Sequence, residues 1–97
     1  MQEDAGVELT GSAMELWPNP NNTGQVNLHF AGLRSKGSTV KVQLLDLMGR
    51  PALQHSIPLA EGSRSITLEL PGTIAVGVYL VQAEVEGQIY VQRLFIE

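Results

Sequence analysis

The side chains that most often catalyse reactions or bind metal ions are sparse in this chain. His29 and His55 are its two histidines, and they lie far apart in a sequence that contains no cysteine. Zinc sites need several nitrogen or sulfur ligands at short spacing, and neither histidine has such a neighbour. We therefore predict that both histidines lie on strand faces or at the surface, and that the chain has no metal site.

A hydrolytic triad is the next candidate, because Ser56, His55 and Asp46 supply the residue types that it needs. Adjacent residues on a strand point to opposite faces, so Ser56 and His55 are not expected to meet. Glu84 and Glu86 could share a cation, but a solvated acidic rim is the better interpretation. With no cysteine, thiol nucleophiles and disulfides are excluded. We predict no catalytic residue and no cofactor site.

Aromatic side chains could form a platform for sugar rings, which usually takes more than one exposed ring. The chain has five aromatic residues, including a single tryptophan, Trp17. We predict that Phe30, Tyr79 and Phe95 belong to the core. Trp17 and Tyr90 are then left for the surface, and two rings give little support to a sugar-binding platform.

Charge and hydropathy exclude further classes of function. Ten acidic and six basic side chains give a net charge of -4, and the basic ones are scattered along the chain. Nucleic-acid binding wants clustered Lys and Arg, so we expect no nucleic-acid partner. No apolar run approaches the roughly 20 residues of a membrane span, and the start lacks the basic and apolar regions of a signal peptide.

The elements that position these residues are predicted to be strands. The central pair spans Thr39 to Ile57, where Val40, Val42 and Leu44 alternate with polar residues as in a strand with one buried face. Asp46 to Gly49 is predicted to form a type I turn between the two strands. At Leu44-Leu45 the apolar alternation slips, which indicates a β-bulge or a strand end covered on both faces.

Similar alternation and turn residues predict the other strands. The expected strands are 14–17, 25–30, 39–45, 52–57, 64–70, 77–85 and 89–96. Apolar residues on both faces of 77–85 indicate a strand covered on both sides, and Glu86-Gly87 is expected to form a tight hairpin turn. Seven short strands with turns about every ten residues predict an all-β fold, an antiparallel β-sandwich of immunoglobulin-like type. A small barrel is the alternative. Residues 1–13 are expected to be a linker or leader from a larger cargo protein, and 14–97 the domain.

Four short motifs carry a resemblance to a known family. They are Leu16 to Pro20 with Gly24 following, Leu45 to Arg50, Gly77 to Val81, and Arg93 to Ile96. In this order and spacing they resemble the C-terminal sorting domain (type A) of proteins exported by the bacterial type IX (Por) secretion system. Two residues depart from the family's pattern. The family usually has Tyr or Phe in place of Trp17, which is a conservative change, and Lys is common in place of Arg93.

The resemblance implies a non-catalytic secretion signal at the end of a larger cargo protein. Its partners would be the type IX outer-membrane translocon and a surface sortase that removes the domain. Its route would pass through the periplasm to the outer-membrane surface or the medium. By position, recognition maps onto Gly77, Val78, Tyr79, Arg93, Leu94, Phe95 and Ile96, and the turn motifs onto Pro18, Asn19, Pro20, Asp46, Gly49 and Arg50.

Most of these motif residues also have a plain structural interpretation. Asp46 and Gly49 suit a turn, the two prolines around Asn19 suit a strand terminator, and Arg50 fits either role equally. Tyr79 resembles a tyrosine corner, whose hydroxyl bonds backbone upstream.

The sequence also leaves open how the domain associates with a partner and whether it has another function. The last hairpin is expected to present an open strand edge at Gln92 and Arg93, where a receptor or a second copy could add a strand. The alternative function is an immunoglobulin-like or fibronectin-like accessory module that binds carbohydrate or protein within an adhesin.

Overall fold

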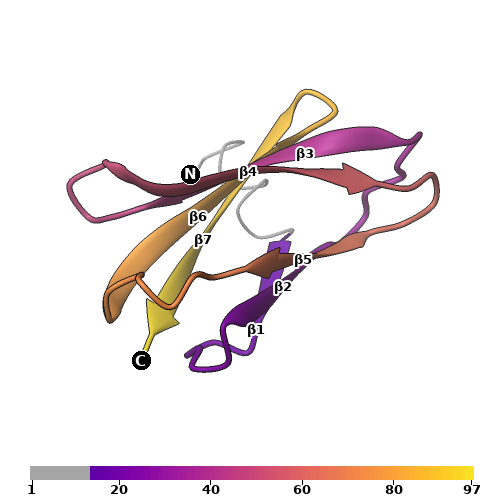
Figure 1. The fold of residues 1–97 in the computed structure, drawn as a ribbon. Coiled ribbons are helices and arrows are strands. Elements are labelled where there is room, and N and C mark those ends of the chain that lie inside the picture. Colours follow the sequence, from indigo (N-terminus) through magenta and orange to yellow (C-terminus); the bar gives the residue numbers. More distant parts are fainter. Residues whose placement is uncertain (1–13) are drawn as a thin grey trace, which may run out of the picture.

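The fold is a sandwich of two antiparallel β-sheets (Figure 1). The computed structural model describes residues 14–97, which contain no helix and therefore no helix long and apolar enough to span a membrane. The strands are β1 (Met14–Trp17), β2 (Gln25–Phe30), β3 (Ser38–Leu45), β4 (Pro51–Leu59), β5 (Ser65–Glu69), β6 (Gly77–Val85) and β7 (Gln88–Ile96). One sheet has the order β1-β2-β5 and the other β4-β3-β6-β7. The predicted immunoglobulin-like sandwich of seven strands is thus confirmed.

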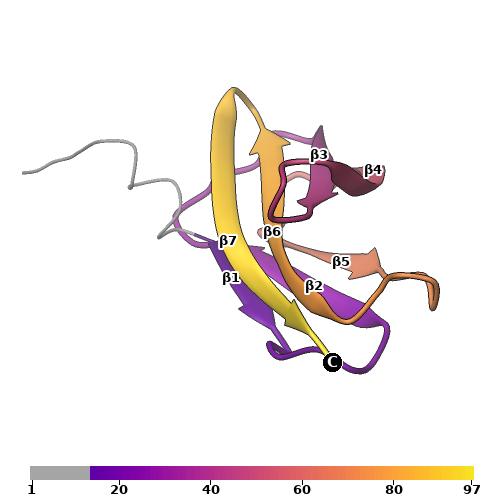
Figure 2. The same cartoon turned by 90° about the vertical axis from the view of Figure 1, so that its left-hand side faces the viewer.

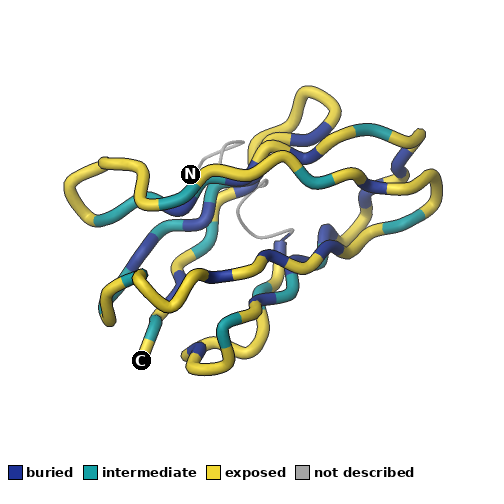
Figure 3. Tube along the Cα trace, viewed as in Figure 1, coloured by how far each residue is buried: buried dark blue, intermediate teal, exposed yellow. Residues whose placement is uncertain are grey.

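The core lies between the two sheets and follows directly from the alternation in the sequence. Val26, Leu28 and Phe30 of β2 are fully buried, while the residues between them remain at least partly accessible. In Figure 3, buried positions alternate with more accessible ones along much of the sandwich, most regularly on β2, β3, β5 and β6. Burying each such Val, Leu or Phe side chain contributes about 1.5–3 kcal/mol, so these inward rows are the main stabilising feature of the fold.

The predicted bulge in β3 and the predicted hairpin turn between β6 and β7 are both confirmed. The β3–β4 register shifts between Leu44 and Leu45, which is the predicted bulge. Glu86 and Gly87 both have positive φ, 50° and 81°, as a two-residue hairpin turn of type I′ requires. Since Val85 pairs with Gln88 across this turn, β6 and β7 form one continuous hairpin.

Four strands, β3, β4, β5 and β7, begin one residue away from the predicted position, and the C-terminal ends of β4 and β5 also differ. β4 continues through Pro58 to Leu59, because β4 is an edge strand and Pro58 needs no ladder donor on its open side. β5 ends at Glu69, although the Leu70 N–H still donates to the Gly24 carbonyl at 2.8 Å.

Two of the predicted aromatic positions are wrong. Phe95 is 40% exposed, whereas Tyr90 is only 2% exposed and packs against Phe30 at a ring-centroid distance of 5.1 Å. Tyr90 and Leu94 are an even number of residues apart and both face inward on β7. Phe95 has the opposite parity, so its ring must lie on the outer face.

The prediction that β6 is covered on both sides is also wrong. Val81, Ala83 and Val85 are buried between the sheets, but Val78 and Leu80 on the other face are only partly buried. No strand from residues 14–97 packs over that outer face, as Figure 2 makes visible.

Candidate functional site

The two C-terminal family motifs lie directly across from each other in the sheet. β6 and β7 form what we call the C-terminal hairpin, residues 77–96. In its register Gly77 pairs with Ile96, Val78 with Phe95, and Tyr79 with Leu94. The third and fourth motifs, which are separated in the sequence, are therefore neighbours at one end of the hairpin.

The N-terminal motif joins the same place through one side chain. Asn19 Nδ2 donates to the Arg93 carbonyl at 2.8 Å, and Asn19 Oδ1 accepts from the Phe95 N–H at 3.0 Å. Two residues later, the Asn21 N–H donates to the Phe95 carbonyl at 2.7 Å and the Asn21 carbonyl accepts from the Glu97 N–H at 2.8 Å. The segment 18–21 thus covers the edge of β7 over its last residues.

This pairing corrects the expectation of an open edge at Gln92 and Arg93. Asn19 bonds the Arg93 carbonyl and the Phe95 N–H, and Asn21 bonds the Phe95 carbonyl. The Gln92 side chain accepts from the Arg93 N–H at 3.1 Å and donates to the Met14 carbonyl at 3.2 Å. Figure 2 shows β7 passing beside β1 at this point. A strand added here would first have to displace segment 18–21.

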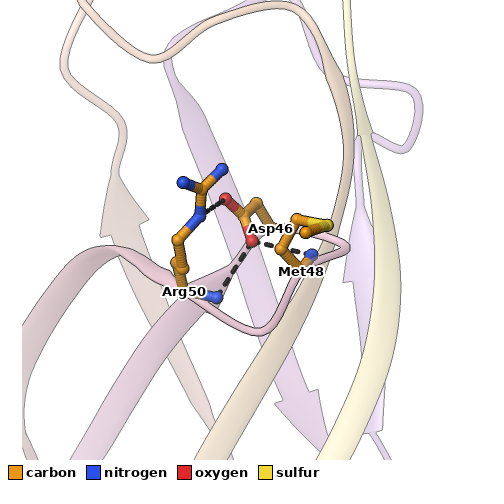
Figure 4. A network of polar contacts seen from close by, with 3 residues as sticks. All are labelled: Asp46, Met48 and Arg50. Atoms are coloured by element: carbon orange, nitrogen blue, oxygen red, sulfur yellow. Dashed lines mark hydrogen bonds and ion pairs between the residues drawn. The ribbon is translucent and has the colours of Figure 1, made fainter.

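The Asp46 motif forms a braced turn (Figure 4). Gly49, at φ 85°, donates its N–H to the Asp46 carbonyl at 2.9 Å. Asp46 Oδ1 accepts from the N–H groups of Met48 and Arg50, both at 2.9 Å, and Oδ2 lies 3.1 Å from Arg50 Nε. The Arg50 N–H has the largest effect and holds the pKa of the Asp46 carboxyl below its usual value, although desolvation acts in the opposite direction. The Met48 N–H and the Arg50 guanidinium lower this pKa further. Turn chemistry therefore accounts for Asp46 and Gly49.

All four motifs gather at the end of the sandwich where β6 begins and β7 ends. Leu45, next to the Asp46 turn, pairs with Leu80, and Leu80 pairs with Arg93. Arg93 in turn receives the Asn19 bond. The sequence alone did not indicate this convergence, because it depends on pairings between segments up to 76 residues apart.

The predicted recognition residues separate into an inner and an outer set. Tyr79 and Leu94 face the core, and the Tyr79 hydroxyl donates to the Ala75 carbonyl at 2.6 Å, as in the predicted tyrosine corner. Val78, Arg93 and Phe95 lie on the outer face of the hairpin. Only this outer set is available to a partner from that side.

The candidates for catalysis or metal binding are dispersed in the fold. His55 pairs with Val42 while Ser56 pairs with Lys41, so their side chains alternate across β4, and the Asp46 carboxylate is occupied by its own turn. Glu86 Oε2 accepts from the Lys36 N–H and the Ser38 hydroxyl, at 2.9 and 3.1 Å. Within residues 14–97, no three His, Asp or Glu side chains come close enough to hold a metal ion.

Comparison with solved structures identifies the architecture. The chain superposes on PorZ, an essential surface component of the type IX secretion system of Porphyromonas gingivalis, with a TM-score of 0.61 and 17% identity over 95% of the chain. It spans only 12% of PorZ. CopC from Methylosinus trichosporium OB3b gives a TM-score of 0.57 and 22% identity, covering 84% of this chain and 86% of CopC. At such identities these likenesses concern the fold alone.

A sequence family is also matched. The family described as "secretion system C-terminal sorting domain" matches residues 15–97, nearly the whole part of the chain that the structure describes. No individual curated protein matches the chain. Members of this family are non-catalytic signals for export to the cell surface or the medium. The chain therefore belongs to the family of type IX secretion C-terminal sorting domains.

Proposed function

We propose that residues 14–97 direct a larger cargo protein from the periplasm through the type IX outer-membrane translocon, and that a surface sortase then removes them. The observation that supports this most directly is the convergence of the family motifs on the end of β7, where Asn19, Leu80 and Arg93 become neighbours. A contiguous surface is what a protein receptor requires. Residues 1–13, the proposed linker to the cargo, lie outside the described residues.

The proposal assigns no chemistry to the domain itself. Recognition falls on the outer set of the C-terminal hairpin, while Tyr79 and Leu94 hold that hairpin in shape from the core side. Arg50 remains a candidate contact, since its side chain is 75% exposed beside a turn that is already rigid.

An export assay tests the proposal. Residues 1–97 would be placed behind a signal peptide and a fluorescent protein, in a bacterium with the type IX machinery and in a strain without the translocon. We expect reporter on the surface or in the medium only when the translocon is present. The mass of the released reporter would reveal sortase cleavage. Reporter kept in the periplasm of both strains, with circular dichroism indicating a folded domain, would refute the proposal.

A deletion of residues 93–97 is the matched variant for this assay. It removes the outer contacts of Arg93 and Phe95 together with the bonds to Asn19 and Asn21, so export should be lost. Because the deletion also removes Leu94 from the core, its folding has to be measured in parallel. Normal export of the truncated protein would contradict a role for these residues.

A homodimer through an edge strand is a further proposal for the same domain. The end of β7 is covered, which leaves β4, the opposite edge of the four-stranded sheet, as the better candidate. Light scattering after size exclusion would detect such a dimer. Replacing an edge residue such as Gln54 by proline would then disfavour it, since a proline removes a backbone donor.

The accessory-module alternative draws on the opposite face of the sandwich. There Trp17 is 46% exposed and lies 6.4 Å from the His29 ring, beside a row of polar side chains. Of the two aromatic residues predicted to lie at the surface, Trp17 is the one available for a sugar ring, because Tyr90 is buried. A glycan-binding screen with wild-type protein and Trp17→Ala would support this alternative only if binding depended on Trp17.

A further inference from the structure

The two outer faces of the sandwich differ sharply in chemistry. On the three-stranded sheet, three cross-strand pairs join polar side chains: Gln25 with Glu69, Asn27 with Thr67, and His29 with Ser65, at 2.8–2.9 Å. On the C-terminal hairpin the outer positions include Val78, Leu80, Ile89, Val91 and Phe95. Three of these remain well exposed, at 46% for Ile89, 37% for Val91 and 40% for Phe95. Apolar side chains that gather on one uncovered face are typical of a binding surface.

A shallow hollow of about 400 Å³ lies in this face. Its lining residues are Asn19, Leu80, Val91, Gln92, Arg93 and Phe95. Arg93 lies directly across from Leu80 and between Val91 and Phe95 on its own strand face, so apolar side chains surround a cation.

The Arg93 guanidinium makes no ion pair with any other residue in the range 14–97, whereas Arg50 is paired with its own turn carboxylate. A cation flanked by apolar surface is complementary to a carboxylate that is itself flanked by apolar side chains. An anionic lipid surface would need a cluster of cations, but the chain carries a net charge of -4. A protein segment fits this surface better than a membrane does.

The geometry also sets the direction of approach. Because Asn19, Asn21 and Gln92 together bond the edge N–H and carbonyl groups of Arg93 and Phe95, a partner reaches this end of β7 over the sheet face and not by adding a strand at the edge. Outer side chains along β7 recur every second residue, which is roughly 7 Å. An extended segment has the same repeat, so its alternate side chains can meet Val91, Arg93 and Phe95 in turn.

We infer that the outer face of the C-terminal hairpin binds an extended protein segment with the pattern apolar-x-acidic-x-apolar, its carboxylate on Arg93 and its apolar side chains on Val91 and Phe95. This inference rests on the proposed sorting function, for which the segment would belong to the receptor.

A peptide titration tests the surface independently of export. ¹⁵N-labelled protein, residues 1–97, would be titrated with acetyl-Phe-Ser-Glu-Ser-Leu-amide and with the matched peptide in which Gln replaces Glu. We expect amide shifts centred on Leu80, Val91 and Arg93, and about two- to fivefold tighter binding of the acidic peptide at low salt. Arg93→Gln should remove that preference, whereas Arg64→Gln, a change at an exposed arginine ahead of β5, should keep it. Shifts confined to Asn27 and Thr67, equal binding of both peptides, or no shifts would overturn the inference.

Charge reversal in the export assay separates the surface from the function. Arg93→Glu should lower translocon-dependent export at least tenfold at an unchanged melting temperature, while Arg64→Glu, which changes the net charge equally, should be exported like wild type. Equal export of both variants would overturn the inference and leave the sorting function intact. Failure of wild type in both strains would refute the sorting function, and the titration alone would then decide whether the surface binds acidic peptides.

Discussion

Asn19 bonds the backbone of β7 on both sides of Leu94, with Nδ2 2.8 Å from the Arg93 oxygen and Oδ1 3.0 Å from the Phe95 nitrogen. A side-chain amide has one donor group and one acceptor oxygen, so it can replace one step of a neighbouring strand. In this way the short loop between β1 and β2 closes part of an edge that would otherwise offer unpaired groups.

Removing this amide should loosen the end of β7. Asn19→Ala loses two hydrogen bonds, each contributing about 0.5–1.5 kcal/mol, so the free energy of unfolding should fall by about 1–3 kcal/mol. Hydrogen exchange of the Phe95 amide should speed up at the same time. Asn22→Ala is the control, because Asn22 is exposed and its side chain bonds no other residue within 14–97. Equal stability of the two variants would show that Asn19 adds nothing to the edge.

The Asp46 turn should give stability a specific pH dependence. Its native pKa lies below the usual 3.8, chiefly through the Arg50 N–H, so the stabilisation is present above the unfolded pKa and disappears as the pH falls through the native one. Asp46→Asn keeps an acceptor oxygen but removes the charge. The melting temperature of wild type should therefore exceed that of Asp46→Asn at pH 7, and the difference should shrink towards zero near pH 2.

Arg50→Gln provides the comparison for this turn. It removes the guanidinium but keeps the Arg50 backbone N–H, which is the largest influence on the Asp46 pKa. The acid-dependent loss of melting temperature should therefore persist largely unchanged in Arg50→Gln. A pH dependence that vanished in this variant would mean that the ion pair, and not the backbone bonds, sets the pKa.

Tyr79→Phe tests the tyrosine corner. The hydroxyl bond to the Ala75 carbonyl, 2.6 Å long, fixes the loop that leads into β6. Losing this bond should lower the free energy of unfolding, measured by urea denaturation, by about 0.5–1 kcal/mol. The loss should stay in the lower part of the usual range for a hydrogen bond because Ala75 is exposed and water can replace the hydroxyl. Tyr90→Phe should cost less, since its hydroxyl bonds only the exposed Gln88 side chain. The opposite order would contradict the structural role of Tyr79.

The local features of this fold were predictable because their signals are local. The alternation at Val40 to Leu44 indicated the central strand, and the slip at Leu45 indicated the bulge that the register contains. Asp46 and Gly49 indicated the turn for two local reasons. The Asp46 carboxylate can accept from the N–H two residues later, that of Met48, and Gly49 tolerates a positive φ.

The candidate site was less predictable because it depends on contacts between distant segments. The bond from Asn19 to Arg93 joins residues 74 positions apart, and no local pattern announces it. Face assignment failed on β7 for a different reason. Ile89, Tyr90, Val91, Leu94 and Phe95 are apolar on both parities, so the alternation did not say which set faced the core.

The corrected face assignment predicts opposite behaviour for the two phenylalanines. Phe30 is fully buried against Tyr90, so Phe30→Ala should cost about 3–5 kcal/mol of unfolding free energy. Phe95 is 40% exposed, so Phe95→Ala should cost less than about 1 kcal/mol. Chemical denaturation followed by circular dichroism measures both. Since Phe30→Ala could unfold the domain outright, Phe30→Leu, which retains most of the buried volume, supplies an intermediate value. A loss of about 3 kcal/mol or more for Phe95→Ala would mean that Phe95 belongs to the core, and that the outer face of β7 is not free to bind a partner.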